Sequence, residues 1–543
     1  MHYLPGARRV AGFLLVSLLT GCSGGGGDDD PTGTQISTNA ISFSAAAPDA
    51  TTPASQVFTA TFGEDIAHLA VIHSGDAVAD VTSTMNGRSA QITVTPTAPS
   101  AVGPGAFTGA VAVTGYTCAD STCSRLSAGS TSTVAVSYQV SPVVQLVTPY
   151  VAISGVSDSV VIRGIGLQSF SVQGVRFGDT AATSITAVSA TEFRATHPAL
   201  AAGTYTVRLN SSNHQGDIPS NATLVVVDPV SYAATTLNYP VAPSAVRGLV
   251  YDAERRALVI VTDAAGGSII RYAYDGAAWG ARLNVAADVR DAALSAKGTQ
   301  LYGITSTAVT PIDPITLALG TAVTAPSPVA NSFLKNIVVG NDDRALITTG
   351  IASSTATAGY LYDPVTAAVV SNGVVLNNAT PTMAANGATA IVSQGDPTLT
   401  ADIAVYSYAT SNNSLATTSV SLRQNTVAPA VDRAVTRVIL NGLRVYGVVS
   451  NDLSLFGTLP DTTTAVVMKP NGTRAYTYDP TLGGIVTYDI SVDRDEAAYV
   501  ALGAATPVAG DPGSGVKMII SPDGGTLFLA GTSQIVVQPT PAL

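Results

Sequence analysis

Residues 41–140 alternate apolar and polar side chains in short runs, as in residues 57–62, 90–94 and 134–138. Glycine, proline and asparagine separate these runs. Side chains that alternate along a strand point to opposite faces of a sheet, so one face of each run can be buried and the other solvated. The pattern predicts an antiparallel β-sandwich.

This segment resembles a bacterial immunoglobulin-like domain, and residues 104–113 are similar to the strand that precedes the cysteine loop in some of these modules. We assign residues 37–141 to it. Cys118 and Cys123 follow that strand and, in an exported chain, predict a local disulfide. A metal site would need further ligands, and no histidine lies nearby. A catalytic redox pair is disfavoured because the spacing is not C-x-x-C.

Residues 142–228 resemble the IPT/TIG family of immunoglobulin-like domains. The resemblance rests on Thr148-Pro149 and on four further segments in order, residues 161–167, 175–178, 187–195 and 202–207. It implies an immunoglobulin-like fold. It does not imply a function, because the same fold hosts adhesion, DNA binding and plain spacing.

Beyond residue 229 a strand, a turn and a second strand recur, most clearly at residues 519–529. The turns of seven copies lie about 45 residues apart on average, the length of a four-stranded propeller blade. They fall at Glu254, Gly298, Asp343, Gly387, Arg433, Gly472 and Gly524. The copy at Arg433 is degenerate. Residues 270–275, 360–364 and 486–489 then form the third strand of their blades.

The last copy ends at its third strand, near residue 538, and therefore lacks an outer strand. Residues 233–238, just before the first blade, have the composition of that missing strand. Pairing between the two segments would close the ring and remove an exposed sheet edge. The region resembles the seven-bladed propellers of the exported YVTN and NHL type, and the fold class is all-β, with two immunoglobulin-like sandwiches followed by a propeller at residues 229–543.

The residue seven positions before each turn is expected to begin an inner strand. These positions are Arg247, Asp291, Asn336, Thr380, Thr426, Ala465 and Lys517. Most of them are polar, so they could line one mouth of the central channel and bind a ligand. The alternative is a ring of solvated channel residues without a ligand.

The first 21 residues have the features of a signal peptide, with Arg8 and Arg9 before an apolar run too short to span a membrane. The run ends in residues 19–22, Leu-Thr-Gly-Cys, which resembles the bacterial lipobox and implies acylation of Cys22. Residues 22–36 are rich in glycine and aspartate and predict a flexible tether. In the sorting pattern that this resembles, Ser23 permits transfer to the outer membrane, which implies a periplasmic or surface-exposed lipoprotein.

The chain has 25 Lys and Arg against 36 Asp and Glu residues, a net charge of −11. This balance and the lack of a basic cluster argue against nucleic acid as a partner. All five His residues and all three Cys residues precede residue 229. The propeller therefore lacks the ligand clusters of metal-dependent propeller enzymes, and no acyl- or phosphoryl-transfer motif is present. We expect no metal and no cofactor.

The order of anchor, tether, sandwiches and propeller indicates a lipid-anchored display protein of the cell envelope that binds a protein or a glycan. One alternative is a hydrolase or lyase acting on a polysaccharide or lactone, with Asp291 and Asp263 as acid and base. Another is a purely structural envelope component.

Overall fold

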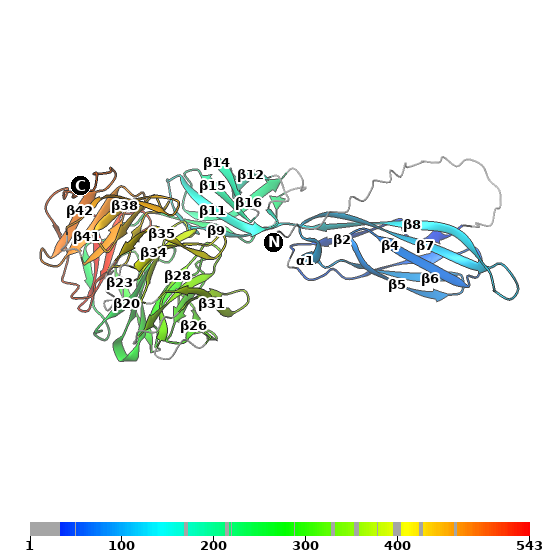
Figure 1. Ribbon diagram of the computed structural model, residues 1–543, viewed down its shortest axis with the longest axis horizontal. Coiled ribbons are helices and arrows are strands. Elements are labelled where there is room, and N and C mark those ends of the chain that lie inside the picture. The colour runs from blue at the N-terminus through cyan, green and yellow to red at the C-terminus, as the bar shows by residue number, and fades with distance from the viewer. Residues whose placement is uncertain are drawn as a thin grey trace, which may run out of the picture. The chain divides into compact units, whose positions relative to one another are not determined.

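The structure is a computed structural model that describes residues 33–542, apart from 49, 168–171, 190, 212–216, 219, 287, 327–331, 352–357, 377, 395–402, 423–426 and 461–463. Figure 1 labels many of its strands. The chain divides into two compact units, one within residues 1–138 and one made mainly of residues 139–543. The short segments 44–51 and 99–105, which include the one-turn helix α1 (Pro99–Val102), belong to the second unit.

The first unit contains two four-stranded sheets. One has the order β1 (Gln35–Ile36), β3 (Gln56–Thr61), β6 (Ser89–Pro96), β5 (Val78–Asn86), and the other β2 (Ala40–Ala45), β8 (Leu126–Val140), β7 (Gly105–Cys118), β4 (His68–Ser74). The sheets are antiparallel except where β2 runs parallel to β8. In β2, β6 and the second half of β8 every second residue is buried; in β2, for example, Ile41 and Phe43 are inside and Ser42 is exposed. The alternation seen in the sequence thus corresponds to the buried faces of an immunoglobulin-like sandwich.

Residues 143–227 form a second sandwich. Its larger sheet contains β10 (Val151–Ile153), β18 (Thr223–Val227), β16 (Gly203–Ser211), β12 (Val172–Phe177) and β13 (Thr180–Ala181), with β17 (Asp217–Ile218) paired to β16. The other sheet has the order β14 (Ser184–Ser189), β15 (Glu192–His197), β11 (Asp158–Ile165), β9 (Val143–Thr148). Ile162, Phe177 and Leu224 are fully buried between them.

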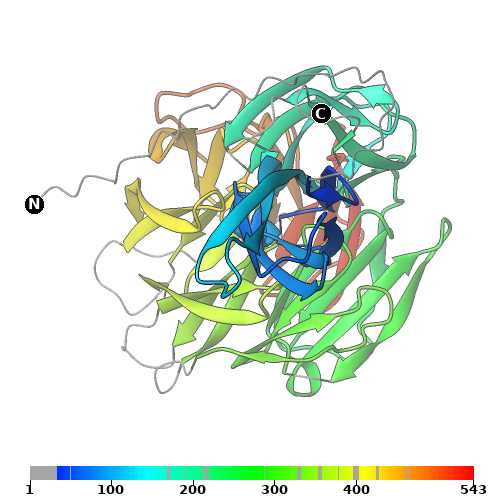
Figure 2. The ribbon, with the colours of Figure 1, turned by 90° about the vertical axis from the view of Figure 1, so that its right-hand side faces the viewer.

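The rest of the chain forms seven four-stranded antiparallel sheets, which follow one another around a ring (Figure 2). Blades one to three are β20 (Val246–Asp252), β21 (Ala257–Thr262), β22 (Ser268–Tyr274), β23 (Trp279–Ala286); β24 (Asp291–Leu294), β25 (Leu301–Ile304), β26 (Ala308–Ile312), β27 (Val323–Thr324); and β28 (Ser332–Val339), β29 (Ala345–Ile351), β30 (Ala358–Asp363), β31 (Ala368–Val375). A 3-10 turn, η2 (Ala264–Gly266), joins β21 to β22.

Blades four to six are β32 (Thr380–Met383), β33 (Thr389–Ser393), β34 (Ile403–Ala409), β35 (Ser414–Leu422); β36 (Ala430–Val431), β37 (Arg437–Leu440), β38 (Arg444–Val449), β39 (Asp452–Thr458); and β40 (Ala465–Met468), β41 (Arg474–Asp479), β42 (Gly484–Asp489), β43 (Thr506–Pro507). Blade seven contains β44 (Lys517–Ile520), β45 (Thr526–Ala530) and β46 (Ile535–Pro539). Its fourth strand is β19 (Thr235–Leu237), which pairs antiparallel with β46 and closes the ring. The all-β fold class and the predicted closure are confirmed.

The turn between the first and second strands repeats from blade to blade. Gly298, Gly387, Gly472 and Gly524 have φ between 66° and 72°, a region that glycine adopts without strain. In blades one and five the left-handed residues are Arg256 and Val435, two positions beyond the predicted turn residues Glu254 and Arg433. The side chain of Asp432 stabilises the turn of blade five, accepting a 2.7 Å hydrogen bond from Thr436 N. The degenerate sequence of that copy therefore reflects a different way of stabilising the same turn.

Candidate functional site

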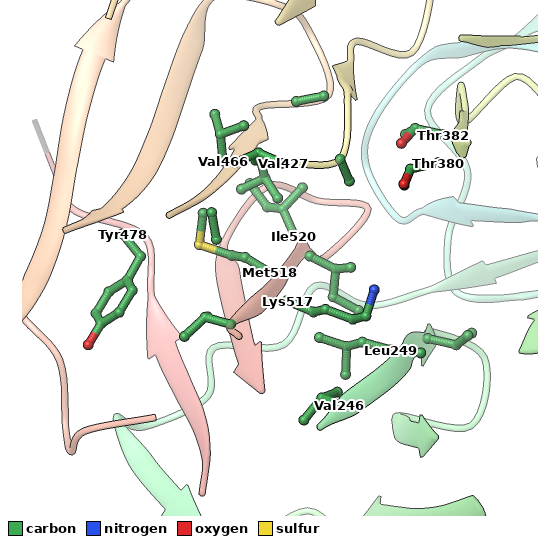
Figure 3. A pocket seen from close by; sticks show the side chains of 18 of the residues that line it. Val246, Leu249, Thr380, Thr382, Val427, Val466, Tyr478, Lys517, Met518 and Ile520 are labelled. Atoms are coloured by element: carbon green, nitrogen blue, oxygen red, sulfur yellow. The ribbon is translucent and has the colours of Figure 1, made fainter. Parts of the chain in front are cut away.

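A cavity of about 1440 Å³ runs along the axis of the propeller and is lined by the inner strands of all seven blades (Figure 3). Val246, Leu249, Val466, Met518 and Ile520 supply apolar walls, and Thr380 and Thr382 supply hydroxyls. The volume exceeds that of an ordinary small-molecule pocket, about 300–1000 Å³. The cavity is thus large enough to admit a ligand bigger than a typical small molecule.

We call the end of the channel at which the inner strands begin the strand-start mouth. Of the seven predicted positions, Asp291, Thr380, Ala465 and Lys517 are the first residues of β24, β32, β40 and β44, and all four line the cavity. Asn336 also lines it but lies within β28, four residues after the strand begins. These residues come from five different blades, so only ring closure brings them together.

Two predicted positions behave differently. Arg247 is the second residue of β20 and does not line the cavity, because the pairing of β20 with β21 shifts register between Val246 and Gly248. Its guanidinium instead donates a 3.3 Å hydrogen bond to Val289 O and lies 3.5 Å from the carboxylate of Asp288. Thr426 lies outside the described residues.

Asp291 joins blade two to blade three. Its Oδ1 accepts a 2.9 Å hydrogen bond from Ala292 N, while Oδ2 accepts bonds from Ile337 N at 3.1 Å and Asn336 Nδ2 at 3.2 Å. Burial raises the pKa of this carboxyl to about 6, although Lys517 and the three donors favour its ionised form. The buried side chain therefore links two blades through hydrogen bonds and also lines the cavity.

The other two charged lining residues are Asp511 and Lys517. Asp511 Oδ1 accepts a 2.9 Å hydrogen bond from Gly513 N and so stabilises its own loop. The ammonium of Lys517 forms no hydrogen bond or ion pair with any residue in the described part of the chain. Figure 3 shows it pointing away from its strand into the cavity. It is thus the cation available there to a ligand.

Two further cations, Arg247 and Arg290, lie beside the strand-start mouth. Arg290 immediately precedes β24, its Nε is 3.8 Å from Asp288, and its guanidinium stacks 4.2 Å from the ring centroid of Phe333. Asp288 also contacts Arg247, so one carboxylate faces two guanidiniums. The sequence pattern did not single out Arg290 or Asp288. The only available signal was their position directly before a predicted inner strand.

The carboxylate pair of the hydrolase alternative is not brought together. Asp263 does not line the cavity that contains Asp291. Its carboxylate accepts hydrogen bonds from Ser244 N at 2.9 Å, from Ala245 N at 2.8 Å, and from the Ser244 hydroxyl. It therefore fixes the segment that leads into blade one. A glycosidase needs two carboxyl groups on opposite sides of one bond, and these two residues do not provide that arrangement.

The opposite end of the channel carries the turns between first and second strands, and residues of the 143–227 sandwich contact these turns. The ring of Tyr150, between β9 and β10, lies against Gly298 of blade two. Asp158 forms an ion pair with Arg433 of blade five. Thr148 lies close to Gly387 of blade four. These contacts occupy the turn side and leave the strand-start mouth untouched.

The remaining predicted site residues lie elsewhere. Cys118 and Cys123 form a disulfide at the end of β7, as predicted, where Asp120 also holds the turn through hydrogen bonds to Thr122 N and Ser124 N. Cys22 lies outside the described residues. Within the described ranges no group of three or more His, Cys, Asp or Glu side chains could hold a metal ion.

Among the residues that the structure describes, no helix is both long enough and apolar enough to cross a membrane.

Residues 142–226 match the family model of the IPT/TIG domain, which confirms the resemblance found in the sequence. No curated protein sequence matches the chain. Solved structures with similar folds include a hydrazine synthase of Kuenenia stuttgartiensis, with a TM-score of 0.44 and 11% identity over 56% of this chain and 98% of that one. An auxiliary nutrient binding protein of Bacteroides ovatus gives 0.36 and 10% over 74% and 98%. A gluconolactonase of Xanthomonas campestris gives 0.35 and 14% over 57% and 90%.

Proposed function

We propose that this chain is a lipid-anchored binding protein of the bacterial cell envelope, and that its ligand, a glycan or a segment of a protein, enters the propeller channel. The observation that carries the proposal is the cavity of about 1440 Å³, whose walls combine apolar, hydroxyl and charged side chains. Binding pockets characteristically join an apolar lining to a few polar groups that orient the ligand.

The proposed location in the cell envelope rests on the sequence. The lipobox ending at Cys22 and the following tether support an anchored protein, and Ser23 supports transfer to the outer membrane. The two sandwiches act as a spacer in this proposal. The propeller is of the YVTN or NHL type.

The test uses the chain from residue 33 onward in a binding screen against envelope glycans and envelope proteins. Thr380 faces the cavity, and its hydroxyl has no hydrogen-bond partner in the described structure, so Thr380→Trp should narrow the channel with little loss of native contacts. Ligand binding should weaken at least about tenfold. The matched control, Val365→Trp, adds the same ring at a side chain that is 90% exposed and should leave binding unchanged. A ligand that both variants bind equally well would place the site outside the channel.

A further inference from the structure

The polar groups of the cavity wall differ in how well they are satisfied. Both lining carboxylates, Asp291 and Asp511, accept hydrogen bonds from the chain itself. The ammonium of Lys517 has no such partner among the described residues and is directed into the cavity (Figure 3). A partly buried cation recovers the free energy of its lost hydration when a bound anion accepts its hydrogen bonds.

Two arginines also lie at the strand-start mouth. Arg247 and Arg290 both face the carboxylate of Asp288, and the charge of Arg247 also acts on the carboxylate of Asp263. These two guanidiniums are therefore compensated by carboxylates of the protein, which leaves Lys517 as the cation that an anionic ligand would meet in the cavity.

The cations at the mouth and in the cavity favour a ligand with a single negative charge over a phosphate. Phosphate is commonly held by arginine forks or by several backbone N–H groups, but the two arginines at this mouth are already engaged with Asp288. Lys517 is the one cationic residue that lines the cavity, and a single ammonium matches a single negative charge.

Apart from Lys517, Asp291 and Asp511, the residues that line the cavity are uncharged. Leu249, Val466, Met518 and Ile520 present apolar surface, and the hydroxyl of Thr380 can donate or accept a hydrogen bond. The body of a matching ligand is therefore neutral, with apolar faces and room for hydroxyl groups.

We propose that the propeller cavity binds an organic carboxylate with an uncharged body, whose carboxylate accepts hydrogen bonds from Lys517 Nζ. The inference rests on the proposed function and adds the chemical class of the ligand. Two sources share this chemistry, namely a sugar acid at the end of a glycan and an apolar monocarboxylic acid.

Isothermal titration calorimetry on the chain from residue 33 onward tests the proposal. The probes are a disaccharide of glucuronic acid and xylose against its neutral glucose analogue, and 4-phenylbutyrate against its neutral amide. At least one acid should bind about tenfold or more tightly than its neutral counterpart. Lys517→Gln should weaken binding of that acid about 10- to 100-fold and remove the preference, because a charge-assisted hydrogen bond is lost. Lys517→Arg should retain the preference.

The control is Lys469→Gln, which removes the same charge in the turn after β40, at the far end of an inner strand, and should change nothing. Equal binding of acid and neutral probes, an acid preference that survives Lys517→Gln, or failure of both acids to bind would each overturn the proposal. If Lys517→Gln fails to fold, the proposal is still tested by two measurements: the comparison of acid and neutral probes in the unchanged protein, and the same comparison in Lys517→Arg. If neutral glycans bind and Thr380→Trp abolishes that binding, the channel is the binding site but its ligand is not a carboxylate. If Thr380→Trp leaves binding unchanged, the ligand does not bind in the channel, and the proposed function itself is contradicted.

Discussion

The buried carboxyl of Asp291 should make the stability of the propeller fall as the pH rises from 4.5 to 7. The side chain is 9% exposed, and burial raises its pKa from 3.8 to about 6. In the unfolded chain the carboxyl ionises near pH 3.8, whereas in the folded protein it retains its proton until about pH 6. Between these values the folded state binds more protons, so the free energy of unfolding decreases with rising pH.

The full difference in pKa corresponds to about 3 kcal/mol, of which about 2 kcal/mol is lost between pH 4.5 and 7. Glu254, Asp342 and Asp343 also have raised pKa values because of burial and act in the same direction. The contribution of Asp291 is therefore isolated by comparing the protein with its Asp291→Asn variant at each pH. The variant is neutral throughout, so its stability relative to the unchanged protein should rise by about 2 kcal/mol from pH 4.5 to 7.

Urea unfolding followed by tryptophan fluorescence provides the measurement. Trp279 is the single tryptophan of the chain and lies in blade one, with its ring centroid 5.0 Å from that of Tyr232 and 6.1 Å from that of Phe528 of blade seven. Its emission therefore reports on the propeller where the ring closes. A stability difference between the protein and Asp291→Asn that does not change with pH would refute the assigned burial of this carboxyl.

Asp263→Asn is the matched control. Burial acts to raise the pKa of Asp263, but hydrogen bonds from Ser244 and Ala245 outweigh it and lower the pKa below 3.8. Its contribution to stability is present above pH 3.8 and is lost only as the pH falls further. The substitution should therefore leave the slope between pH 4.5 and 7 unchanged, whatever its effect on absolute stability.

Two further substitutions test separate parts of the description. Gly298→Ala should destabilise the propeller by about 2–4 kcal/mol in the same urea assay. The backbone at this position has φ of 68°, which strains any residue with a β-carbon, and the added β-carbon would overlap the ring of Tyr150. Gly483→Ala, at φ of 58° with open space around it, should cost only about 1 kcal/mol. Cys22→Ser should abolish incorporation of labelled palmitate and release the protein from the membrane fraction of the cells, and continued labelling would contradict the lipobox assignment.

The sequence was informative about the propeller wherever a blade used glycine at its first turn. Gly298, Gly387, Gly472 and Gly524 fixed the register of their blades, and counting back from them placed Asp291, Thr380, Ala465 and Lys517 at the start of inner strands. A fixed count of seven residues from the turn back to the start of the inner strand holds only if the strand between them is regular. It succeeded in blades two, four, six and seven, in which glycine marks the turn and the pairing of the first strand runs without a register shift.

Irregular pairing explains where it failed. A register shift between Val246 and Gly248 displaces Arg247, and one between Leu334 and Asn336 places Asn336 inside its strand. A bulge adds one residue to one strand without a distinctive sequence signature, so apolar alternation does not reveal it. The contacts of Tyr150 with Gly298 and of Asp158 with Arg433 were inaccessible for a different reason, since they join segments more than 140 residues apart.

The geometry of the candidate site depends on a closure formed by a short strand. Asp291 and Lys517 belong to blades two and seven, and the ring between them is closed where blade one meets blade seven. The strand β19 contributes only Thr235–Leu237 to that closure. Packing supplies the rest: Tyr251 stacks on Phe528 with ring centroids 4.7 Å apart, and the hydroxyls of Tyr232 and Tyr251 lie 2.8 Å apart. Aromatic pairs of this kind contribute about 0.5–1.5 kcal/mol each beyond the area they bury. Because this cluster joins β20 to the blade that begins with Lys517, it also holds the lysine in place relative to the rest of the cavity wall.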